Sequence, residues 1–531
     1  MRPPDRLRAD ADHSAHSHRR RREQLKFSKW MSPLLASAAA VVCAAPRVPQ
    51  SATLSSDAAT VRVVIDSHSV SPIEPGFAGY NVALMDVAFG YRDRRFASQV
   101  KRLGPGWLRY PAGTRSEAFD WTTGTSHPSW IDRASLTFSR DVQSDFRTIL
   151  QRTLEVLEAK GGEHIDDAAS LAASAGAQGL IVCVNVFTDT PASARRFSEY
   201  VRHHHLRVLG WELGNEPYFN RKLWPTASAY AAAVRPFADA IRAGDSSASI
   251  GVSMSDAGFT DHAWDDSLAA FRPRYWDFVI YHHYPTTVHG SPAEMMAALN
   301  HVLLHGTTDY LQDEVASRFG SMPVMITEVG PQDGPGPGMS GTIYGGIWSA
   351  EYALRMSSVP QVKYFGIHQL VGAAGVGVTH RFVRELIASW SSGHRLQTDS
   401  LDFGLFESAQ GAAYALAASV IDSSTATYRT RVEGGGRAPL PRHDSASAVF
   451  GAAYRLRGQP VVVTTNKGAG EETVAIVVDG RPVQGPFNVI TVSAADPSQR
   501  NTAGNEAVAA RSFVASGLIR VAPYSVVRIS W

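Results

Sequence analysis

The chain has little cysteine, with two in 531 residues. Cys43 lies in a basic and apolar leader, so Cys183 stands alone in the rest, inside the apolar run 180–186. A single cysteine outside the leader excludes a disulfide framework, and a cysteine within an apolar strand is typical of a small core residue. We therefore expect neither a disulfide-stapled fold nor a cysteine nucleophile.

A long hydrophobic run is also missing. The apolar stretch 31–45 is too short and too rich in alanine for a membrane-spanning helix. It follows the basic residues of segment 19–29, and the order of basic, apolar and small residues is that of a secretory signal peptide. We expect residues 1–45 to be an export signal, which predicts a periplasmic or secreted protein without a stable membrane span.

Beyond this leader the chain has no excess of positive charge. Residues 1–45 contain nine Lys or Arg and four Asp or Glu, a net charge of +5, whereas the whole chain carries +2. The remainder is therefore near −3, with no long run of Lys or Arg. This charge excludes nucleic acid as an expected partner and argues against a heavily sulfated polymer as the main substrate.

From residue 76 onward, strand patterns alternate with helical patterns. The eight predicted strands are 76–83, 106–111, 179–187, 206–213, 247–253, 277–284, 324–328 and 362–370. The helical patterns between them are 94–103, 140–158, 166–175, 193–203, 227–243, 267–271, 293–305, 309–319 and 342–358. This alternation predicts an α/β fold with a parallel sheet, and eight strands favour a closed (β/α)8 TIM barrel over residues 76–405.

The pattern changes after Asp402. A last helix, 409–421, precedes short β-rich runs at 448–456, 460–466, 473–478, 487–492 and 522–531, separated by Gly, Asp and Pro. Such runs predict a C-terminal antiparallel β-sandwich domain over residues 406–531. The early strand 60–66, in the linking segment 46–75, is expected to pair with that domain.

Two glutamates end predicted barrel strands four and seven. Glu216 follows the buried run 206–213, where Pro217 stops the strand, and Glu328 ends the run 324–328. In this fold the active site lies at the carboxyl ends of the barrel strands. A pair of carboxyl groups at that position is typical of the catalytic residues of a glycosidase. We expect Glu216 to be the general acid/base and Glu328 the nucleophile of a retaining enzyme, with carboxyl groups about 5–5.5 Å apart. The competing interpretation of each is a solvated loop glutamate.

The sixth predicted strand ends in two histidines and a tyrosine. Because side chains alternate along a strand, His282 and Tyr284 share one face and His283 takes the other. By the same alternation Thr327 points away from the face of Glu328. A tyrosine or histidine beside a nucleophile can orient it, although such residues more often form an aromatic core. Adjacent histidines on a strand diverge, so we predict no metal site, and no cofactor.

Further polar or flexible residues are candidates for substrate binding. They are Asn81, Thr114, Arg115, Asn215, Gly334 and Gly336. Asn215 could bond a sugar hydroxyl, and the glycines could present N–H groups to an anionic group, although Pro335 and Pro337 remove donors there.

Four motifs together resemble glycoside hydrolase family 79, the heparanase and β-glucuronidase family. They are WELGNEP at 211–217, TE at 327–328, HHY at 282–284 and LRYPAGT at 108–114. The resemblance spans about residues 60–531 and implies Glu216 as acid/base and Glu328 as nucleophile. It also implies that Asn215, His283 and the pair Thr114–Arg115 line the site, and that Gly334 helps to hold a glucuronic carboxylate.

Three hypotheses follow for the function. The first is a retaining β-glucuronidase, with heparanase-like action on a polysaccharide containing glucuronic acid as a variant. The second is a related barrel glycosidase on neutral sugars, such as an arabinofuranosidase or xylanase. The third, a carbohydrate-binding protein without activity, is disfavoured because both glutamates are present.

Overall fold

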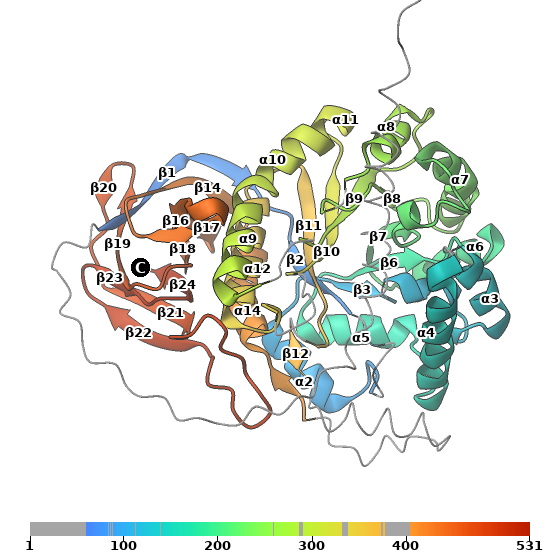
Figure 1. Ribbon diagram of the computed structural model, residues 1–531, viewed down its shortest axis with the longest axis horizontal. Helices are drawn as coiled ribbons and strands as arrows, with labels where there is room; N and C mark the ends of the chain where they lie inside the picture. Colours follow the sequence, from blue (N-terminus) through green and yellow to red (C-terminus); the bar gives the residue numbers. More distant parts are fainter. Residues whose placement is uncertain are drawn as a thin grey trace, which may run out of the picture.

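Figure 1 shows the computed structural model, in which a barrel ringed by helices lies beside a β-rich part. It describes residues 60–531 except 83, 85, 86, 88, 112, 138, 139, 259, 286–289, 332–337, 373, 374 and 378–403. The predicted export signal lies outside the described residues, as do Gly334 and Gly336.

Eight parallel strands close the barrel in chain order. They are β2 (Ala78–Asn81), β3 (Leu108–Tyr110), β6 (Leu180–Val184), β7 (Val208–Leu213), β8 (Ile250–Ser253), β9 (Phe278–His283), β10 (Val324–Val329) and β11 (Val362–His368). Each coincides with one of the apolar runs of the sequence, so the predicted barrel is confirmed. In this order β7 is the fourth strand and β10 the seventh, the two that precede or carry the paired glutamates.

The helices of the barrel follow the predicted segments closely. They are α2 (Arg94–Leu103), α4 (Arg140–Ala159), α5 (Ile165–Ala175), α6 (Pro191–His203), α7 (Ala227–Gly244), α8 (His262–Ala270), α9 (Pro292–His305), α12 (Ile343–Met356) and α14 (Ala409–Asp422). Helix α8 begins at His262 rather than Ser267, because Asp261 caps it by accepting a hydrogen bond from the Trp264 amide at 3.1 Å. The predicted helix 309–319 is divided into α10 (Thr308–Tyr310), the π-helical η3 (Leu311–Ala316) and α11 (Ser317–Phe319).

Short elements that the sequence did not predict decorate the loops. They are the helix α3 (Pro128–Leu136), the 3-10 helices η1 (Thr114–Ala118), η2 (Pro217–Phe219) and η5 (Pro441–His443), and the two-stranded pairs β4 (Phe119–Asp120) with β5 (Thr125–Ser126), β12 (Val376–Gly377) with β13 (Phe406–Glu407), and β15 (Arg437–Pro439) with β16 (Ser445–Ser447). Among them η1 and η2 begin four positions after the ends of β3 and β7, the second and fourth barrel strands, where they shape the mouth of the barrel.

The predicted C-terminal β domain is confirmed, with one correction. Its strands are β1 (Val61–Pro72), β14 (Ala426–Glu433), β17 (Val449–Leu456), β18 (Gln459–Asn466), β19 (Glu472–Val478), β20 (Arg481–Pro482), β21 (Phe487–Ser493), β22 (Arg511–Ala515), β23 (Ile519–Val521) and β24 (Ser525–Ser530). They form one ten-stranded sheet in which β1 joins as predicted, but its pairing with β19 is parallel, so the sheet is not purely antiparallel. Strands far apart in the sheet order, such as β1 and β21, share one apolar core, so the sheet curls over itself.

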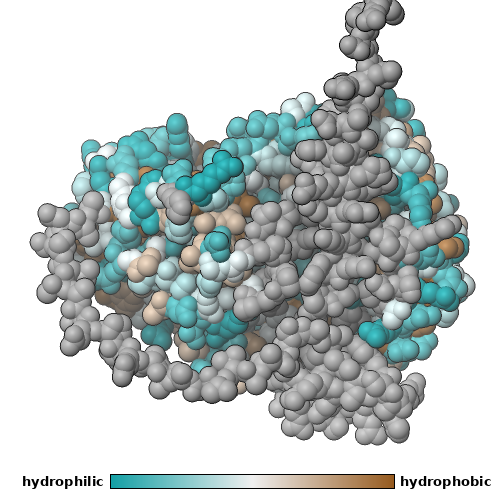
Figure 2. Space-filling view, in the orientation of Figure 1, coloured by the Kyte–Doolittle hydropathy of each residue, from teal (hydrophilic) through white to brown (hydrophobic). Residues whose placement is uncertain are grey.

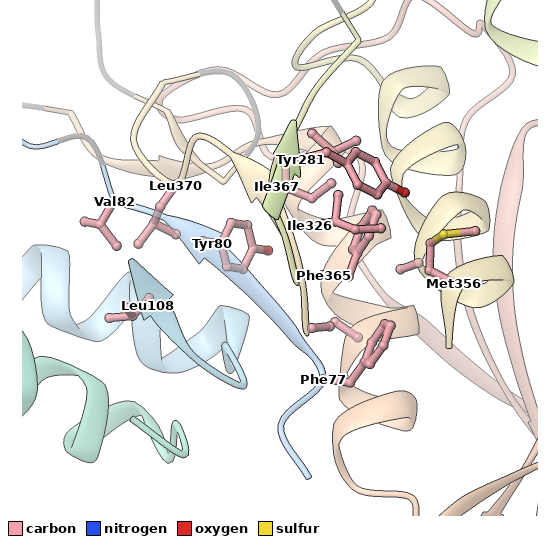
Figure 3. Close-up of a cluster of buried hydrophobic side chains, with 14 of the residues drawn as sticks. Phe77, Tyr80, Val82, Leu108, Tyr281, Ile326, Met356, Phe365, Ile367 and Leu370 are labelled. Carbon is pink, nitrogen blue, oxygen red and sulfur yellow. The ribbon is translucent and has the colours of Figure 1, made fainter. Parts of the chain in front are cut away.

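Side chains on the barrel strands alternate between the interior and the surrounding helices. Trp107, Ile280 and Met325 belong to a cluster inside the barrel, whereas Tyr281 and Ile326, their neighbours in sequence, belong to the large cluster that includes helix residues. Figure 3 shows Tyr281 and Ile326 on the side of Met356, at the end of α12. The alternation decides which strand-end residues reach the active site.

The face shown in Figure 2 is mostly hydrophilic where its residues are described. Within the described part of the chain, no helix combines the length and the apolar character that a membrane span requires.

A substitution at the floor of the barrel should destabilise the protein. A Cβ added at Gly79 would lie 2.3 Å from the Trp107 ring, and one added at Gly366 would meet the same ring at 2.3 Å. Because Trp107 is fully buried and has no room to move, Gly79→Ala should lower the free energy of unfolding by about 1–3 kcal/mol, as overpacking does. Urea unfolding followed by tryptophan fluorescence would measure it.

The control is Gly470→Ala, because nothing lies within 4 Å of a Cβ added at Gly470. Equal stability of the Gly79→Ala and Gly470→Ala proteins would contradict the close packing of the barrel floor.

Candidate active site

The two predicted glutamates meet at the carboxyl end of the barrel. An oxygen of Glu216, an oxygen of Glu328 and a ring nitrogen of His282 all lie within 4.8 Å of one another. Both carboxyl groups are nearly buried, with 6% of Glu216 and 2% of Glu328 exposed. The structure thus brings together residues that are 112 positions apart, and it rules out two separate solvated loop glutamates.

Glu328 is held from both sides by donors. Its Oε1 accepts a hydrogen bond from Asn81 Nδ2 at 2.6 Å and one from Arg109 Nη1, and its Oε2 accepts from the Tyr284 hydroxyl at 2.5 Å. Burial alone would raise the pKa of Glu328, but attraction to His282, His368 and Arg109 and the bond from Tyr284 lower it to about 2. Glu328 is therefore an ionised carboxylate in the neutral range, with its two oxygens fixed in direction.

Arg109 is the buried cation that orders this region, and only 1% of it is exposed. Its Nε lies 2.7 Å and its Nη2 2.6 Å from Glu212 Oε2, its Nη1 bonds Glu328, and its Nη2 donates to Asn215 Oδ1 at 3.0 Å. Although burial opposes the charge, the Glu212 and Glu328 carboxylates raise the pKa of Arg109 above its usual value. In the sequence Arg109 stands only as part of the LRYPAGT run, and the fold makes it the common anchor of three site residues.

Glu216 has different surroundings. Its Oε1 lies 2.8 Å from His282 Nδ1 and 3.1 Å from the Tyr218 hydroxyl, while Asn215 Nδ2 lies 3.5 Å from its Oε2. The backbone of Glu216 is left-handed, with φ of 45°, a conformation that costs a residue with a side chain roughly 1–2 kcal/mol. Strained backbone of this kind gathers at functional sites, where the surrounding structure imposes it.

His282 connects the two glutamates, as its predicted face requires. Its Nδ1 bonds Glu216 and lies 3.7 Å from Glu328 Oε2, and its Nε2 lies 3.2 Å from Thr327 Oγ1. Burial would lower the pKa of His282, but the Glu328 charge and the bond to Glu216 raise it.

The predicted outward direction of Thr327 is wrong. Two residues of β10 oppose one of β9, since Ile326 pairs with Tyr281 and Glu328 with His282. This bulge breaks the alternation, so Thr327 and Glu328 both reach His282.

The expectation that His283 lines the site is also wrong. Its Nδ1 lies 2.6 Å from the hydroxyl of Tyr352 on α12, and burial lowers its pKa to about 3. The physical reason is the alternation along β9, which points His282 and Tyr284 into the barrel and turns His283 toward the helices.

Of the remaining candidates, the structure brings Asn81, Asn215 and Thr114 to the site. Thr114 Oγ1 accepts a hydrogen bond from Asn215 Nδ2 at 3.4 Å. Arg115 follows Thr114 in η1 and is partly buried, and its role in binding stays a prediction. The proposed donors Gly334 and Gly336 lie outside the described residues.

Besides Tyr218, three further site residues escaped the sequence analysis. His368 ends β11 with its Nδ1 3.6 Å from Glu328 Oε2, and burial lowers the pKa of this histidine. Glu117 and Asp256 are buried carboxyl groups whose pKa values are raised well above normal, first by burial and then also by the charge of Glu216. His368 carries the same signal as the glutamates, a polar residue at a strand end, whereas Glu117 lies in a loop helix without a motif.

The trio of Glu216, His282 and Glu328 has the spacing of a metal-ligand set. However, a ring nitrogen of His282 already bonds Glu216, and the guanidinium of Arg109 already neutralises Glu328. A divalent cation would have to displace the first contact and sit close to the like charge of the second. The donor set therefore fits proton transfer better than metal binding, and the expected lack of a metal stays a prediction.

The fold is shared with known glycoside hydrolases. No family model matches the chain, and no curated protein matches it in sequence. Among solved structures, it is similar to the GH51 α-L-arabinofuranosidase of Thermotoga petrophila, with a TM-score of 0.62, 17% identity, and 89% of this chain and 100% of that one covered. The GH51 arabinofuranosidase of Xanthomonas axonopodis pv. citri gives a TM-score of 0.63 at 14% identity, with 88% and 99% covered.

A third similar structure is the 4-O-α-L-rhamnosyl-β-D-glucuronidase of Fusarium oxysporum. Its TM-score is 0.53 at 13% identity, with 88% of this chain and 100% of that chain covered. At such identities the likeness shows the fold, a (β/α)8 barrel with a β domain.

Removal of the Arg109 charge should test whether this residue stabilises the candidate active site. In Arg109→Met, Glu212 and Glu328 are left buried without their cation, which should cost about 3–5 kcal/mol of stability at pH 7. In the parent protein, the lowered pKa of Glu328 adds stability above the unfolded value of about 4.3, and this is lost as the pH falls toward 2. The difference between the two proteins should therefore shrink on acidification, as chemical unfolding at pH 7 and at about pH 3 would measure.

Arg62→Met is the matched control, since Arg62 forms a surface ion pair with Glu433 and is 53% exposed. That change should cost less than about 1 kcal/mol. A loss of equal size in both variants, or one that does not depend on pH, would contradict the anchoring role of Arg109.

Proposed function

We propose that this protein is a retaining glycoside hydrolase with Glu328 as nucleophile and Glu216 as general acid/base. The observation that carries the proposal is the approach of the two carboxyl groups to within 4.8 Å in unlike surroundings. Carboxyl groups about 5–5.5 Å apart leave room for a glycosidic bond but not for a water molecule behind it, whereas roughly 6.5–9.5 Å is typical of inverting enzymes.

The reaction runs in two displacements. In the first, a Glu328 oxygen forms a bond to the anomeric carbon as the bond to the leaving oxygen breaks, and Glu216 gives that oxygen its proton. In the second, Glu216 removes a proton from water, whose oxygen attacks the anomeric carbon and releases the Glu328 carboxylate. The two inversions give net retention of configuration.

The neighbours of the glutamates fit these roles. His282, His368 and Arg109 keep Glu328 ionised, as a nucleophile requires. The hydrogen bonds from Asn81 and Tyr284 hold its two oxygens in direction. His282 and Tyr218 contact one oxygen of Glu216, which leaves the other, near Asn215, as the oxygen that can carry the exchanged proton. Asn215 is itself oriented by Arg109 and Thr114, so its amide is placed to bond a substrate hydroxyl.

For the substrate we propose a β-glucuronide, alone or within a polysaccharide that contains glucuronic acid. The support is the resemblance of the WELGNEP, TE, HHY and LRYPAGT runs to glycoside hydrolase family 79. A solved structure named for a β-D-glucuronidase is among those of similar fold. From the export signal predicted for residues 1–45, we further propose that the enzyme is periplasmic or secreted and acts on glycans outside the cytoplasm.

An α-L-arabinofuranoside is the second candidate. It is favoured by the higher TM-scores of the arabinofuranosidases, 0.62 and 0.63, against 0.53 for the rhamnosyl-glucuronidase. In addition, the side-chain donors of Arg109 go to Glu212, Glu328 and Asn215, so this cation is not available to a substrate carboxylate.

Variants of the two glutamates should separate their roles. Glu328→Gln should abolish the covalent glycosyl-enzyme, detected by mass spectrometry of the protein trapped with a slow substrate. Glu216→Gln should lower kcat/KM by about 10²–10⁴-fold for substrates with poor leaving groups and far less for activated aryl glycosides, because only the former need protonation. Equal losses of Glu216→Gln on both kinds of substrate would contradict its role as the acid.

A direct comparison of kcat/KM distinguishes the two substrate candidates. A site built for a carboxylate leaves its donors unpaired when that group is missing, so an aryl β-glucuronide should exceed the matching β-glucoside in kcat/KM by roughly 10²-fold or more. The aryl α-L-arabinofuranoside is measured beside them. Comparable values for glucuronide and glucoside, or a clear preference for the arabinofuranoside, would reject the glucuronide and support the neutral sugar.

A further inference from the structure

A cavity of about 270 Å³ lies where the barrel meets the β domain. Helices α9 and α12 form one wall, and strands β14 and β17 form the other, as their neighbouring places in Figure 1 suggest. None of the residues around Glu216 and Glu328 described above lines this cavity. It is therefore a second concave site, distinct from the proposed active site.

Two cations and one carboxylate form the inner end of this cavity. Glu351 on α12 is fully buried, and its Oε1 accepts hydrogen bonds from Arg355 Nε at 3.1 Å and Nη2 at 2.7 Å. Its Oε2 accepts from Lys467 Nζ and from Thr465 Oγ1 at 2.8 Å. These contacts join the barrel helix to the β domain and use both oxygens of Glu351 fully.

The two cations have fewer of their hydrogen-bonding groups paired than the carboxylate that they share. The Lys467 side chain is 4% exposed, and within the described residues one of its three ammonium donors is used, on Glu351. Arg355 directs Nε and Nη2 to the same carboxylate, and its guanidinium carbon stands 4.3 Å from the centre of the Phe450 ring. Two positive charges thus share one negative charge beside an open space, and a buried donor without an acceptor is costly.

The rest of the lining limits what could enter. Arg431 on β14 stands exposed at the rim and bonds Glu433 Oε1 at 2.7 Å. Arg62 bonds the same carboxylate, so the three side chains together carry one net positive charge beside the approach. Asn300 has both ends of its amide engaged, with Pro439 and Tyr344, and shapes the wall without offering a free group. The volume is just below the range of roughly 300–1,000 Å³ for ligand pockets, which restricts the occupant to a compact molecule.

We propose that this cavity binds a small oxyanion, a carboxylate or phosphate carried by a compact polar molecule, through Lys467 and Arg355. One added negative charge balances the two cations and the single carboxylate, and the oxyanion accepts the donors that Glu351 leaves unused. Since both walls contribute contacts, the bound anion stabilises the docking of the β domain on the barrel, and the midpoint of thermal unfolding rises with its concentration.

The test measures thermal unfolding of the full chain against increasing inorganic phosphate and D-glucuronate, with sodium chloride holding the ionic strength constant. D-Glucose is the neutral match for glucuronate. The midpoint should rise with at least one oxyanion and stay unchanged with glucose. A rise with phosphate alone identifies a phosphate ligand, a rise with glucuronate alone a sugar acid, and a rise with both the shared oxyanion chemistry. No rise with either probe overturns the proposal.

Variants then locate the bound anion. The change Arg355→Gln leaves Lys467 and Glu351 as a neutral pair and removes the excess positive charge that the anion balances, so it should weaken binding roughly tenfold or more in calorimetric titration. An unchanged affinity, including binding of glucuronate at the active site instead, would reject the assignment.

A second pair of variants tests the cavity at exposed positions, where a substitution does not disturb buried packing. Arg431→Gln at the rim should weaken binding by about two- to threefold, since rim charges act mainly on the approach of the ligand. Arg429→Gln is the matched control, because Arg429 is exposed on the same strand but does not line the cavity. Equal losses in the two proteins would indicate attraction by overall charge and would contradict a built site.

Discussion

The buried guanidinium of Arg109 is the interaction on which the candidate active site depends. It bonds Glu212, Glu328 and Asn215, which come from the fourth barrel strand, the seventh, and the loop after the fourth. A charged side chain that is 1% exposed is stable there because carboxylates surround it, and Arg109, together with His282 and His368, lowers the pKa of Glu328 in turn. The same set of contacts thus compensates the buried charges and fixes the position of Glu328, the proposed nucleophile.

Beneath this charged layer, the floor of the barrel is apolar and tightly packed. Trp107 lies directly before β3 and precedes Arg109 by two positions, so both point inward, Trp107 to the floor and Arg109 to the site. Gly79 and Gly366 leave room for the tryptophan ring. The floor closes the barrel to water from below, which strengthens the electrostatic contacts above it.

The asymmetry between the two glutamates follows from what the neighbouring strands supply. Glu328 accepts hydrogen bonds from a guanidinium, an amide and a tyrosine hydroxyl. Glu216 is contacted by a histidine and a tyrosine hydroxyl, and its backbone conformation is strained. Two carboxyl groups in unlike environments can hold different protonation states at one pH, which is what an acid and a nucleophile need. The bulge in β10 adds Thr327 to this arrangement, where it contacts the far nitrogen of His282.

The sequence by itself determined the barrel, the β domain and the two glutamates, because apolar periodicity and strand-end polarity are local properties of a chain. It also placed His282 and Tyr284 on one face, since alternation along a strand is geometric. Only the tertiary structure decided that Arg109 joins three site residues, that Thr327 faces inward, that His283 faces α12, and that β1 pairs with β19 in parallel. These facts depend on a bulge, on register between distant strands and on the pairing of buried charges, and none of them is encoded within one segment of the chain.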